Sequence, residues 1–176
     1  MVKKIAIVLV LLIGGLLAFA ATRPDTFHVE RTATMKAPPE KIFAVLEDFH
    51  QWSAWSPWDK LDPKMTRSHS GAERGVGAIY EWQGNKDVGK GKMELVEATP
   101  NTKIVQKLTF IEPWEAQNTV TFTITAKGAE TDVTWAMDGD NEFIGKLMGI
   151  FMDMDGMIGK DFEAGLANLK ALVEKG

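Results

Sequence analysis

The chain has 176 residues, 45% hydrophobic and 25% charged, and is therefore long and apolar enough for one domain with a buried core. It contains no cysteine, which excludes disulfides, thiolate chemistry and zinc sites built on cysteine. Residues 22–176 carry all 24 Asp and Glu and all of the 20 Lys and Arg except Lys3 and Lys4, so their formal net charge is −6. We do not expect a nucleic-acid partner, because nucleic-acid binders carry positive charge where they contact phosphate.

An apolar segment, Ile5–Ala21, follows two lysines near the N-terminus. It is near the minimum length for a membrane span and slightly long for the core of a secretory signal. We predict that residues 1–24 form a membrane anchor and that a domain of residues 25–176 lies outside the cytoplasm, in the periplasm or at the cell surface. The alternative is secretion after signal cleavage, because Ala18-Phe19-Ala20 fits a small-x-small cleavage site.

The domain begins with a predicted strand and a short helix. Apolar and polar residues alternate over Phe27–Met35 as in a half-buried strand, except that Arg31 falls on the apolar side. Ala37-Pro38-Pro39-Glu40 ends this strand and opens a helix that we expect to end around Asp48. The next segment, Trp52–Trp58, holds three of the six tryptophans and is expected to pack on the domain or to border an opening.

Short strands joined by turns fill the middle of the chain. A first short strand is expected over residues 65–69, and later strands are separated by turns near residues 84–87, 99–102, 113 and 128. In the clearest strand, threonines at 119, 121, 123 and 125 alternate with inward-facing Val120, Phe122, Ile124 and Ala126. Consecutive strands without an intervening helix predict an antiparallel meander.

Two helices are predicted at the C-terminal end. A short one runs from Phe143 to about Phe151, and a long one covers Asp153–Lys175. The long helix has one apolar stripe, formed by Ile158, Phe162, Leu166 and Leu169. Such a stripe needs a large flat partner, so we predict an α+β fold with this helix laid across the antiparallel sheet.

Four stretches carry a recognisable pattern: Phe27-x-Val29-x-Arg31, Trp52-x-x-Trp55-Ser56-Pro57-Trp58, Gly75-Val76-Gly77-Ala78-x-Tyr80-x-Trp82 and Gly159-x-Asp161-Phe162-x-x-Gly165-Leu166. From about residue 27 to the end, the chain resembles the START-like SRPBCC superfamily and, within it, the polyketide cyclase/dehydrase and lipid-transport family. The resemblance implies a helix-grip (START/Bet v 1-like) fold, in which a curved sheet wraps the C-terminal helix around an apolar cavity. It brings no catalytic residue set to any position of this chain.

Candidates for ligand binding are polar residues on inward strand faces and large side chains near the expected cavity. They are Arg31, Tyr80, Trp82, Gln106, Asn118, Trp135, Met148, Met152, Phe162 and Leu166. Structural hydrogen bonds and core packing are the alternative explanation for the same residues. Arg31 needs a carboxylate, for which Glu81 or Glu97 could serve, or an anionic ligand head.

The cavity is expected between the sheet and the long helix. Gly165 keeps the bulk of that helix small, and Met148, Met152 and Met157 are expected to border the entrance. Replacing the glycine by leucine should then fill free space.

Metal and cofactor sites are not expected. The three histidines lack ligand spacing, and the acidic runs 138–142 and 153–155 lack the pattern of a calcium loop. We therefore favour a tethered module that binds or carries a hydrophobic small molecule or lipid. The alternatives are a cyclase or dehydratase using Arg31, Tyr80 and Glu81 on a polyketide-like ligand, and a protein-interaction module whose cavity is filled.

Overall fold

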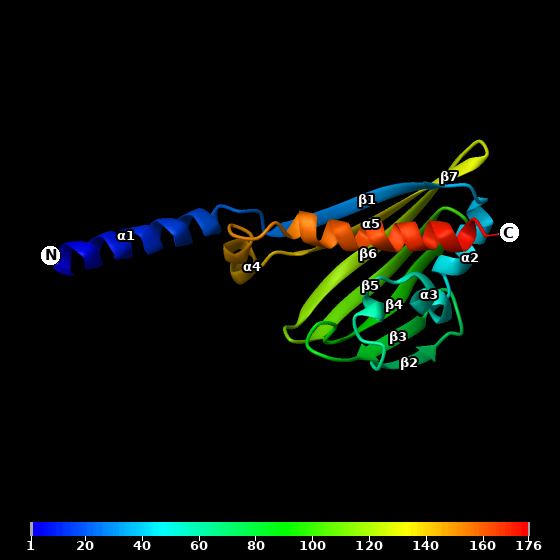
Figure 1. The fold of residues 1–176 in the computed structure, drawn as a ribbon, viewed down its shortest axis with the longest axis horizontal. Coiled ribbons are helices and arrows are strands. Elements are labelled where there is room, and N and C mark those ends of the chain that lie inside the picture. The colour runs from blue at the N-terminus through cyan, green and yellow to red at the C-terminus, as the bar shows by residue number, and fades with distance from the viewer. Residues whose placement is uncertain (1, 176) are drawn as a thin grey trace.

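A seven-stranded antiparallel sheet curves around the C-terminal helix in the computed structural model, which describes residues 2–175 (Figure 1). The strands are β1 (Thr26–Met35), β2 (Thr66–Gly71), β3 (Ala78–Gln83), β4 (Lys90–Thr99), β5 (Lys103–Glu112), β6 (Ala116–Lys127) and β7 (Glu130–Asp140). Their order in the sheet is β1-β7-β6-β5-β4-β3-β2, so β2 to β7 form a meander and β1 closes on β7. The predicted α+β helix-grip architecture is confirmed.

The helices differ in length and in what they cover. They are α1 (Val2–Ala21), α2 (Pro39–Leu46), α3 (Trp52–Trp55), α4 (Phe143–Met148) and α5 (Met154–Val173), with 3₁₀ turns η1 (Phe49–Gln51) and η2 (Trp58–Lys60). Helix α2 has proline in its first turn, as predicted, and buries its apolar side. The tryptophan segment packs on the domain, one of the two expected arrangements, and it coils into α3 and η2, which lets Trp52 and Trp55 turn inward and become buried.

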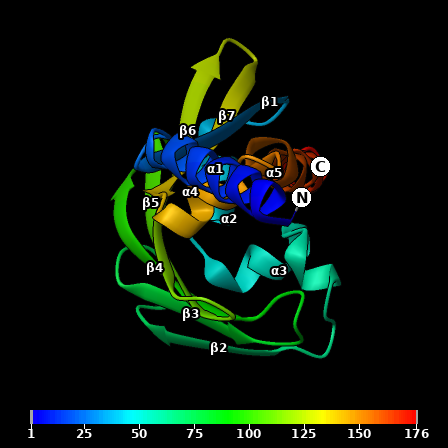
Figure 2. The ribbon, with the colours of Figure 1, turned by 90° about the vertical axis from the view of Figure 1, so that its left-hand side faces the viewer.

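Helix α5 lies across the inner face of the sheet and contacts β1, β7 and α3 (Figure 2). Phe162, Leu166, Leu169 and Val173 are buried, as their spacing predicts, and Ile158 is partly buried at the same side. The ring of Phe162 stacks on Trp135 of β7 with 4.2 Å between ring centroids. This contact fixes how closely the helix approaches the sheet.

The alternation of strand β6 is confirmed over most of its length. Val120, Phe122 and Ile124 are buried, and the threonines between them face outward. Ala126 was expected to face inward, but it is exposed. The reason is that the β6–β7 hairpin projects beyond the core, where no helix covers it (Figure 1).

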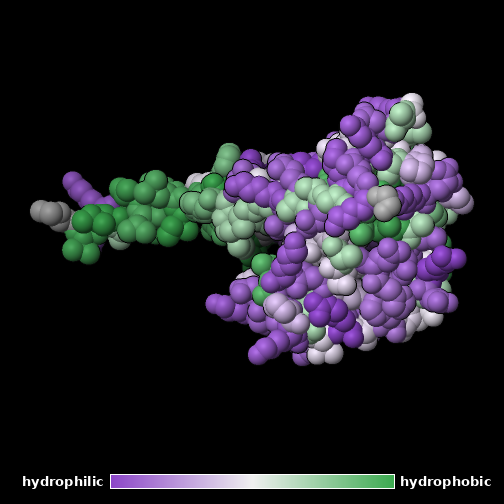
Figure 3. Space-filling model, turned by 45° about the vertical axis from the view of Figure 1, so that its right-hand side comes forward, coloured by the Kyte–Doolittle hydropathy of each residue, from purple (hydrophilic) through white to green (hydrophobic). Residues whose placement is uncertain are grey.

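Helix α1 projects away from the domain as a separate apolar rod (Figure 3). Its side chains are exposed except near the domain, where Ala20 is fully buried. The helix is long and apolar enough to cross a membrane by length and composition. A signal sequence near an N-terminus would pass the same test.

Candidate functional site

The strand register places six of the predicted ligand-binding residues on one face of the sheet, including Arg31, which pairs with Trp135. Tyr80 of β3 lies in a row that crosses Met93, Leu108 and Asn118 to reach Gly139 of β7. The next row toward α2 contains Leu95, Gln106 and Val120, and the row beyond it contains Phe122 and Trp135. Trp82 lies on the other side of Tyr80, opposite Gly91. The inner face therefore combines an apolar surface with a few polar groups, as small-molecule sites do.

Gln106 is the most unusual side chain of this face. It is 1% exposed and lies between Leu95 of β4 and Val120 of β6. Among residues 2–175, neither atom of its amide has a hydrogen-bond partner. A buried amide without partners is unfavourable, so this group indicates a place where something polar fits.

Asn118 lies one row away from Gln106 and is also buried. A Cβ at position 139 would lie 2.0 Å from its Oδ1 atom, so only glycine leaves room for the amide there. The two amides face the same side from neighbouring strands, which puts them within reach of one ligand.

Tyr80 lies at the β2–β3 side of the face, beside an ion pair that the sequence did not reveal. Arg67 Nε donates to Asp59 Oδ1 at 2.6 Å, and both side chains are largely buried. Burial and the charge of Asp59 raise the pKa of Tyr80 to about 12, although the charge of Arg67 opposes this. The hydroxyl lies near Arg67 but forms no hydrogen bond of good geometry within residues 2–175. Tyr80 is thus a neutral, buried group that can donate a hydrogen bond.

Asp59 and Arg67 were missed because neither stands out in the sequence. Asp59 follows Trp58 in a polar stretch, and Arg67 belongs to a short strand without clear alternation. Tyr80 is the residue that could have pointed to them. A buried phenol needs a hydrogen-bond partner, and the neighbouring strand β2 contains one arginine, Arg67.

The centre of the space between sheet and α5 is filled by aromatic rings. Trp55 and Trp135 lie 5.4 Å apart by ring centroids, and Trp52, Trp58, Phe122 and Phe162 surround them. A Cβ at position 165 would lie 2.6 Å from Cζ3 of Trp135. The expectation of free space at Gly165 is therefore wrong, and this glycine allows close packing.

Arg31 lies on the inner face opposite Trp135, and its guanidinium joins the sheet to α5. Its Nη2 atom lies 2.9 Å from Asp155 Oδ2, and its Nε atom lies 3.0 Å from Glu163 Oε1. A Cβ at position 159 would lie 1.9 Å from Nη2, so the guanidinium crosses the helix at Gly159. The partners suggested from the sequence are wrong: Glu97 pairs with Lys103 at 2.6 Å, and Glu81 accepts a hydrogen bond from Ser68.

The three side chains considered for acid–base chemistry do not share a site. Tyr80 is buried on the inner face, and Glu81 is exposed on the outer face of the same strand. Arg31 is occupied by its two carboxylate partners on α5. Alternation along β3 separates the first two, because successive side chains of a strand point to opposite faces.

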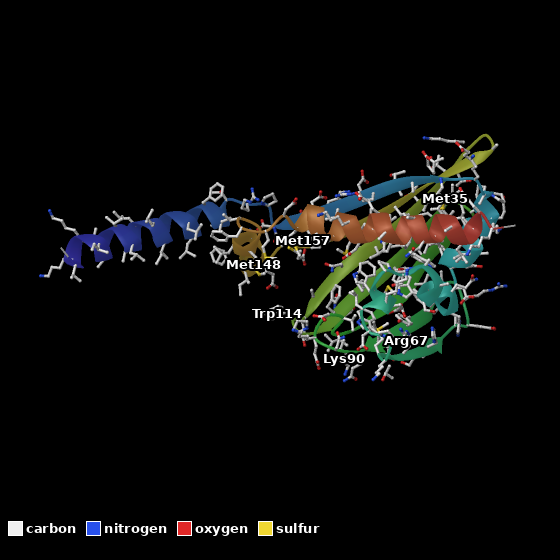
Figure 4. All side chains as sticks on the ribbon, viewed as in Figure 1. Met35, Arg67, Lys90, Trp114, Met148 and Met157 are labelled. Atoms are coloured by element: carbon white, nitrogen blue, oxygen red, sulfur yellow. The ribbon has the colours of Figure 1, made fainter. Side chains whose placement is uncertain are left out.

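The remaining predicted residues lie in two other places. Phe162 and Leu166 are buried in α5, where Phe162 stacks on Trp135. Met148 and Met152 are half-exposed beside α1, at the end of the domain where Figure 4 shows Met148 and Met157. They are therefore outside the rows that hold Gln106 and Tyr80.

A hollow of about 720 Å³ crosses β1, β4, β5, β6 and β7. Its lining combines outer-face residues such as His28 and Lys107 with Gln106, Asn118 and Gly139 of the inner face. It therefore reaches both amides, but its lining includes no residue of α5, so it is not the expected space under that helix. Within residues 2–175, no group of three or more His, Asp or Glu is arranged to hold a metal ion.

Comparison with protein families matches residues 26–174 to the family described as "Polyketide cyclase / dehydrase and lipid transport". The match covers the whole helix-grip domain and leaves out α1. No curated protein is significantly similar to the chain in sequence.

Solved structures show the same fold at low sequence identity. Protein CV1439 from Chromobacterium violaceum is 18% identical with a TM-score of 0.61, over 88% of this chain and 100% of that one. Major latex-like protein 151 from Panax ginseng is 14% identical with a TM-score of 0.60, over 85% and 99%. The di-domain ARO/CYC BexL from the BE-7585A biosynthetic pathway is 13% identical with a TM-score of 0.63, over 91% of this chain and 54% of that one.

Proposed function

Because this chain belongs to the polyketide cyclase/dehydrase and lipid-transport family, we propose that it binds or carries a hydrophobic small molecule or lipid on the inner face of its sheet. The proposed contact residues are Tyr80, Trp82, Gln106, Asn118 and Trp135. Helix α1 tethers this domain to a membrane, with the domain on the outer side. The first part concerns the site, and the second concerns its location.

The buried amide of Gln106 is the observation that carries the proposal. Leaving such a group without partners costs about 1–3 kcal/mol in the folded protein. A hydroxyl group on a ligand would satisfy both of its atoms, because a hydroxyl accepts from Nε2 and donates to Oε1. The apolar neighbours Leu95 and Val120 would contact the rest of the molecule. The favoured ligand is thus a largely apolar molecule with a hydroxyl group.

A binding role is favoured over catalysis by the separation of Tyr80, Glu81 and Arg31. General acid–base catalysis needs groups that reach the same reacting atoms. With Glu81 on the outer face and Arg31 paired to α5, Tyr80 has neither as a partner at the site. Its high pKa suits a hydrogen-bond donor better than a base.

The tether is supported by the sequence around α1. Two lysines precede the apolar segment, and lysines flanking a span favour the cytoplasmic side. The domain after α1 then lies outside the cytoplasm. Secretion after cleavage near Ala20 is the alternative for location and leaves the proposed site unchanged.

The test is probe binding by the full chain in lipid nanodiscs. A fluorescent sterol and a fluorescent fatty acid are titrated against the protein, and bound lipid is extracted and identified by mass spectrometry. We expect saturable, one-to-one binding that Gln106→Leu weakens about tenfold, which corresponds to about 1.4 kcal/mol.

Thr123→Val is the matched control, because Thr123 lies on the neighbouring strand, faces outward and does not line the hollow that Gln106 borders. It should bind like the wild type. If neither probe binds and no lipid is extracted, or if Gln106→Leu binds as tightly as the control, the inner face is not the ligand site.

A further inference from the structure

Large apolar side chains are exposed around α4 and the turn that follows it. Ile144 is 70% exposed and Phe151 is 72% exposed, and Phe143, Met148, Met154 and Met157 are exposed as well. Soluble domains seldom present so many large apolar residues within one short segment, and such patches mark sites of interaction.

This segment is held against the end of α1. Only Thr22–Asp25 separate α1 from β1, and they contact α4 or its flanks at several points. The amide of Asn141 donates to the carbonyl of Asp25 at 2.7 Å, and Lys146 forms an ion pair with the Asp25 carboxylate. Arg23 Nη2 donates to the carbonyl of Gly149 at 3.4 Å. The position of α4 relative to α1 is therefore fixed by short contacts (Figures 1 and 4).

The length of α1 sets where α4 lies relative to a bilayer. With 20 residues, α1 spans about 30 Å, which equals the thickness of the hydrocarbon core. If α1 crosses the membrane, Ala21 lies at the edge of the core. A segment tied to residues 23–25 must then lie at the level of the lipid headgroups.

We propose that residues 143–157 lie in the outer interfacial layer of the bilayer that α1 spans, with Ile144 and Phe151 inserted among the lipids. The segment is continuous with the apolar surface of α1, which selects a lipid surface as its partner. Residues 143–157 contain two acidic residues, Asp153 and Asp155, and one basic residue, Lys146. We therefore expect no electrostatic attraction of this segment to anionic lipids. Insertion is driven by burial of apolar surface and needs no negative charge on the membrane.

This inference rests on the tether in the proposed function, and the test separates the two. The natural chain has no cysteine, so any introduced cysteine is unique. Ile144→Cys and Phe151→Cys are labelled with an environment-sensitive fluorophore, and the full chain is reconstituted in phosphatidylcholine nanodiscs. Quenching by spin-labelled lipid and by aqueous iodide reports the surroundings of each label.

Two control positions bracket the result. Leu12→Cys lies in the middle of α1. Val76→Cys replaces an apolar residue that is 56% exposed. It lies far from α1, because the backbone N–H of neighbouring Gly75 donates to the carbonyl of Glu47 at the end of α2. We expect labels at 144 and 151 to be quenched by lipid and protected from iodide, and the label at 76 to show the opposite.

Three outcomes would overturn the inference in different ways. Labels at 144 and 151 that behave like 76, with 12 in lipid, reject insertion but leave the tether standing. A label at 12 that is open to iodide rejects the tether and the inference together. If the labels at 144 and 151 are protected from both quenchers, and if this protection occurs only at high protein concentration, a second copy of the protein covers the segment in place of lipid. Binding of the fluorescent sterol is measured on the same samples and reports the ligand site independently.

Discussion

At the scale of single residues, the amide of Gln106, which has no hydrogen-bond partner among residues 2–175, connects stability to binding. Its burial on an apolar face lowers the stability of the ligand-free fold, because water cannot reach a group that the protein leaves without a partner. The same amide would become satisfied when a hydroxyl-bearing ligand is present. Stability and affinity are thus expected to respond to this residue in opposite directions.

Gln106→Leu should therefore stabilise the ligand-free protein by about 1–2 kcal/mol, because a side chain of similar size replaces an unsatisfied amide. Chemical denaturation of delipidated protein in detergent measures the change. Gln117→Leu, at an exposed position of β6, should change stability by less than about 0.5 kcal/mol. A Gln106→Leu protein that is less stable than the wild type would mean that the amide has partners in solution.

His28 offers a second test at this scale, through pH. Its Nδ1 atom lies 2.6 Å from Asp138 Oδ1, and this hydrogen bond raises the pKa of His28, with partial burial opposing it and the charges of Asp138 and Glu30 adding to it. A raised pKa means that protonated His28 stabilises the fold at pH values below about 6.5, the unfolded pKa, and that this contribution disappears as pH rises through the folded value.

We expect His28→Gln to lose stability at pH 5.5 and to match the wild type at pH 9. The difference should stay below about 1 kcal/mol, since half of the side chain is in water. Denaturation curves at both pH values check this. Asp138→Asn should reduce the same pH dependence, since only Glu30 then remains beside the ring, and a His28→Gln effect that is equal at both pH values would contradict the assignment.

Arg31 shows what single-residue reasoning can and cannot predict. Alternation in β1 correctly placed it on the side of the sheet that faces α5, and its need for a carboxylate follows from its charge. The identity of the partner was predicted wrongly, because Asp155 and Glu163 lie more than 120 residues away in the chain. The position of α5 along the sheet decides which of its residues contact β1. The sequence pattern does not predict that position.

At the scale of elements, α5 packs closely on β7 because Gly165 has no side chain at the point where the two elements meet. The strand presents Trp135, and the helix meets it with glycine on one turn and the stacked ring of Phe162 on the previous turn. The rule that small residues leave cavities does not hold here, because a small residue opposite a large one completes the packing.

Gly165→Ala should destabilise the protein by about 1–3 kcal/mol, although alanine favours helices by about 1 kcal/mol, because the added Cβ meets a rigid indole. Denaturation by urea in detergent measures this. Ala167→Leu adds a larger group to the exposed side of the same helix and should change stability by less than about 0.5 kcal/mol. A stabilised Gly165→Ala protein would show that Trp135 can move away and that space exists after all.

Periodicity predicted the elements well where one side is buried throughout. The long helix was expected at Asp153–Lys175 and covers Met154–Val173, and the strands of the meander follow in the predicted order. The tryptophan segment was not predicted to coil, because aromatic residues around a proline give no period. The prediction that Ala126 faces inward is wrong, because burial at the end of β6 depends on where the core ends.

At the scale of the whole molecule, fold and family were predictable, but the ligand was not. The family match covers residues 26–174, which include the whole sheet and the helix that it holds. Structures of this fold include a latex-like protein and an ARO/CYC di-domain, so the fold alone does not determine what the inner face contacts. The position of the domain relative to a membrane is the molecular property that α1 makes testable.

The proposed orientation rests on the charges at the ends of α1. Lys3 and Lys4 precede the apolar segment, and only Arg23 follows it closely, which favours an N-terminus in the cytoplasm and the domain outside.

We expect Thr125→Cys in the projecting β6–β7 hairpin to react with a membrane-impermeant maleimide added to intact spheroplasts of a bacterial host. Val2→Cys, which keeps both lysines, should react only after the membrane is permeabilised. Immunoblotting after alkaline carbonate washing should find the chain in the membrane fraction at full length. Labelling of Val2→Cys from outside, with Thr125→Cys protected, would reverse the topology, and a shortened chain in the soluble fraction would establish the cleaved-signal alternative.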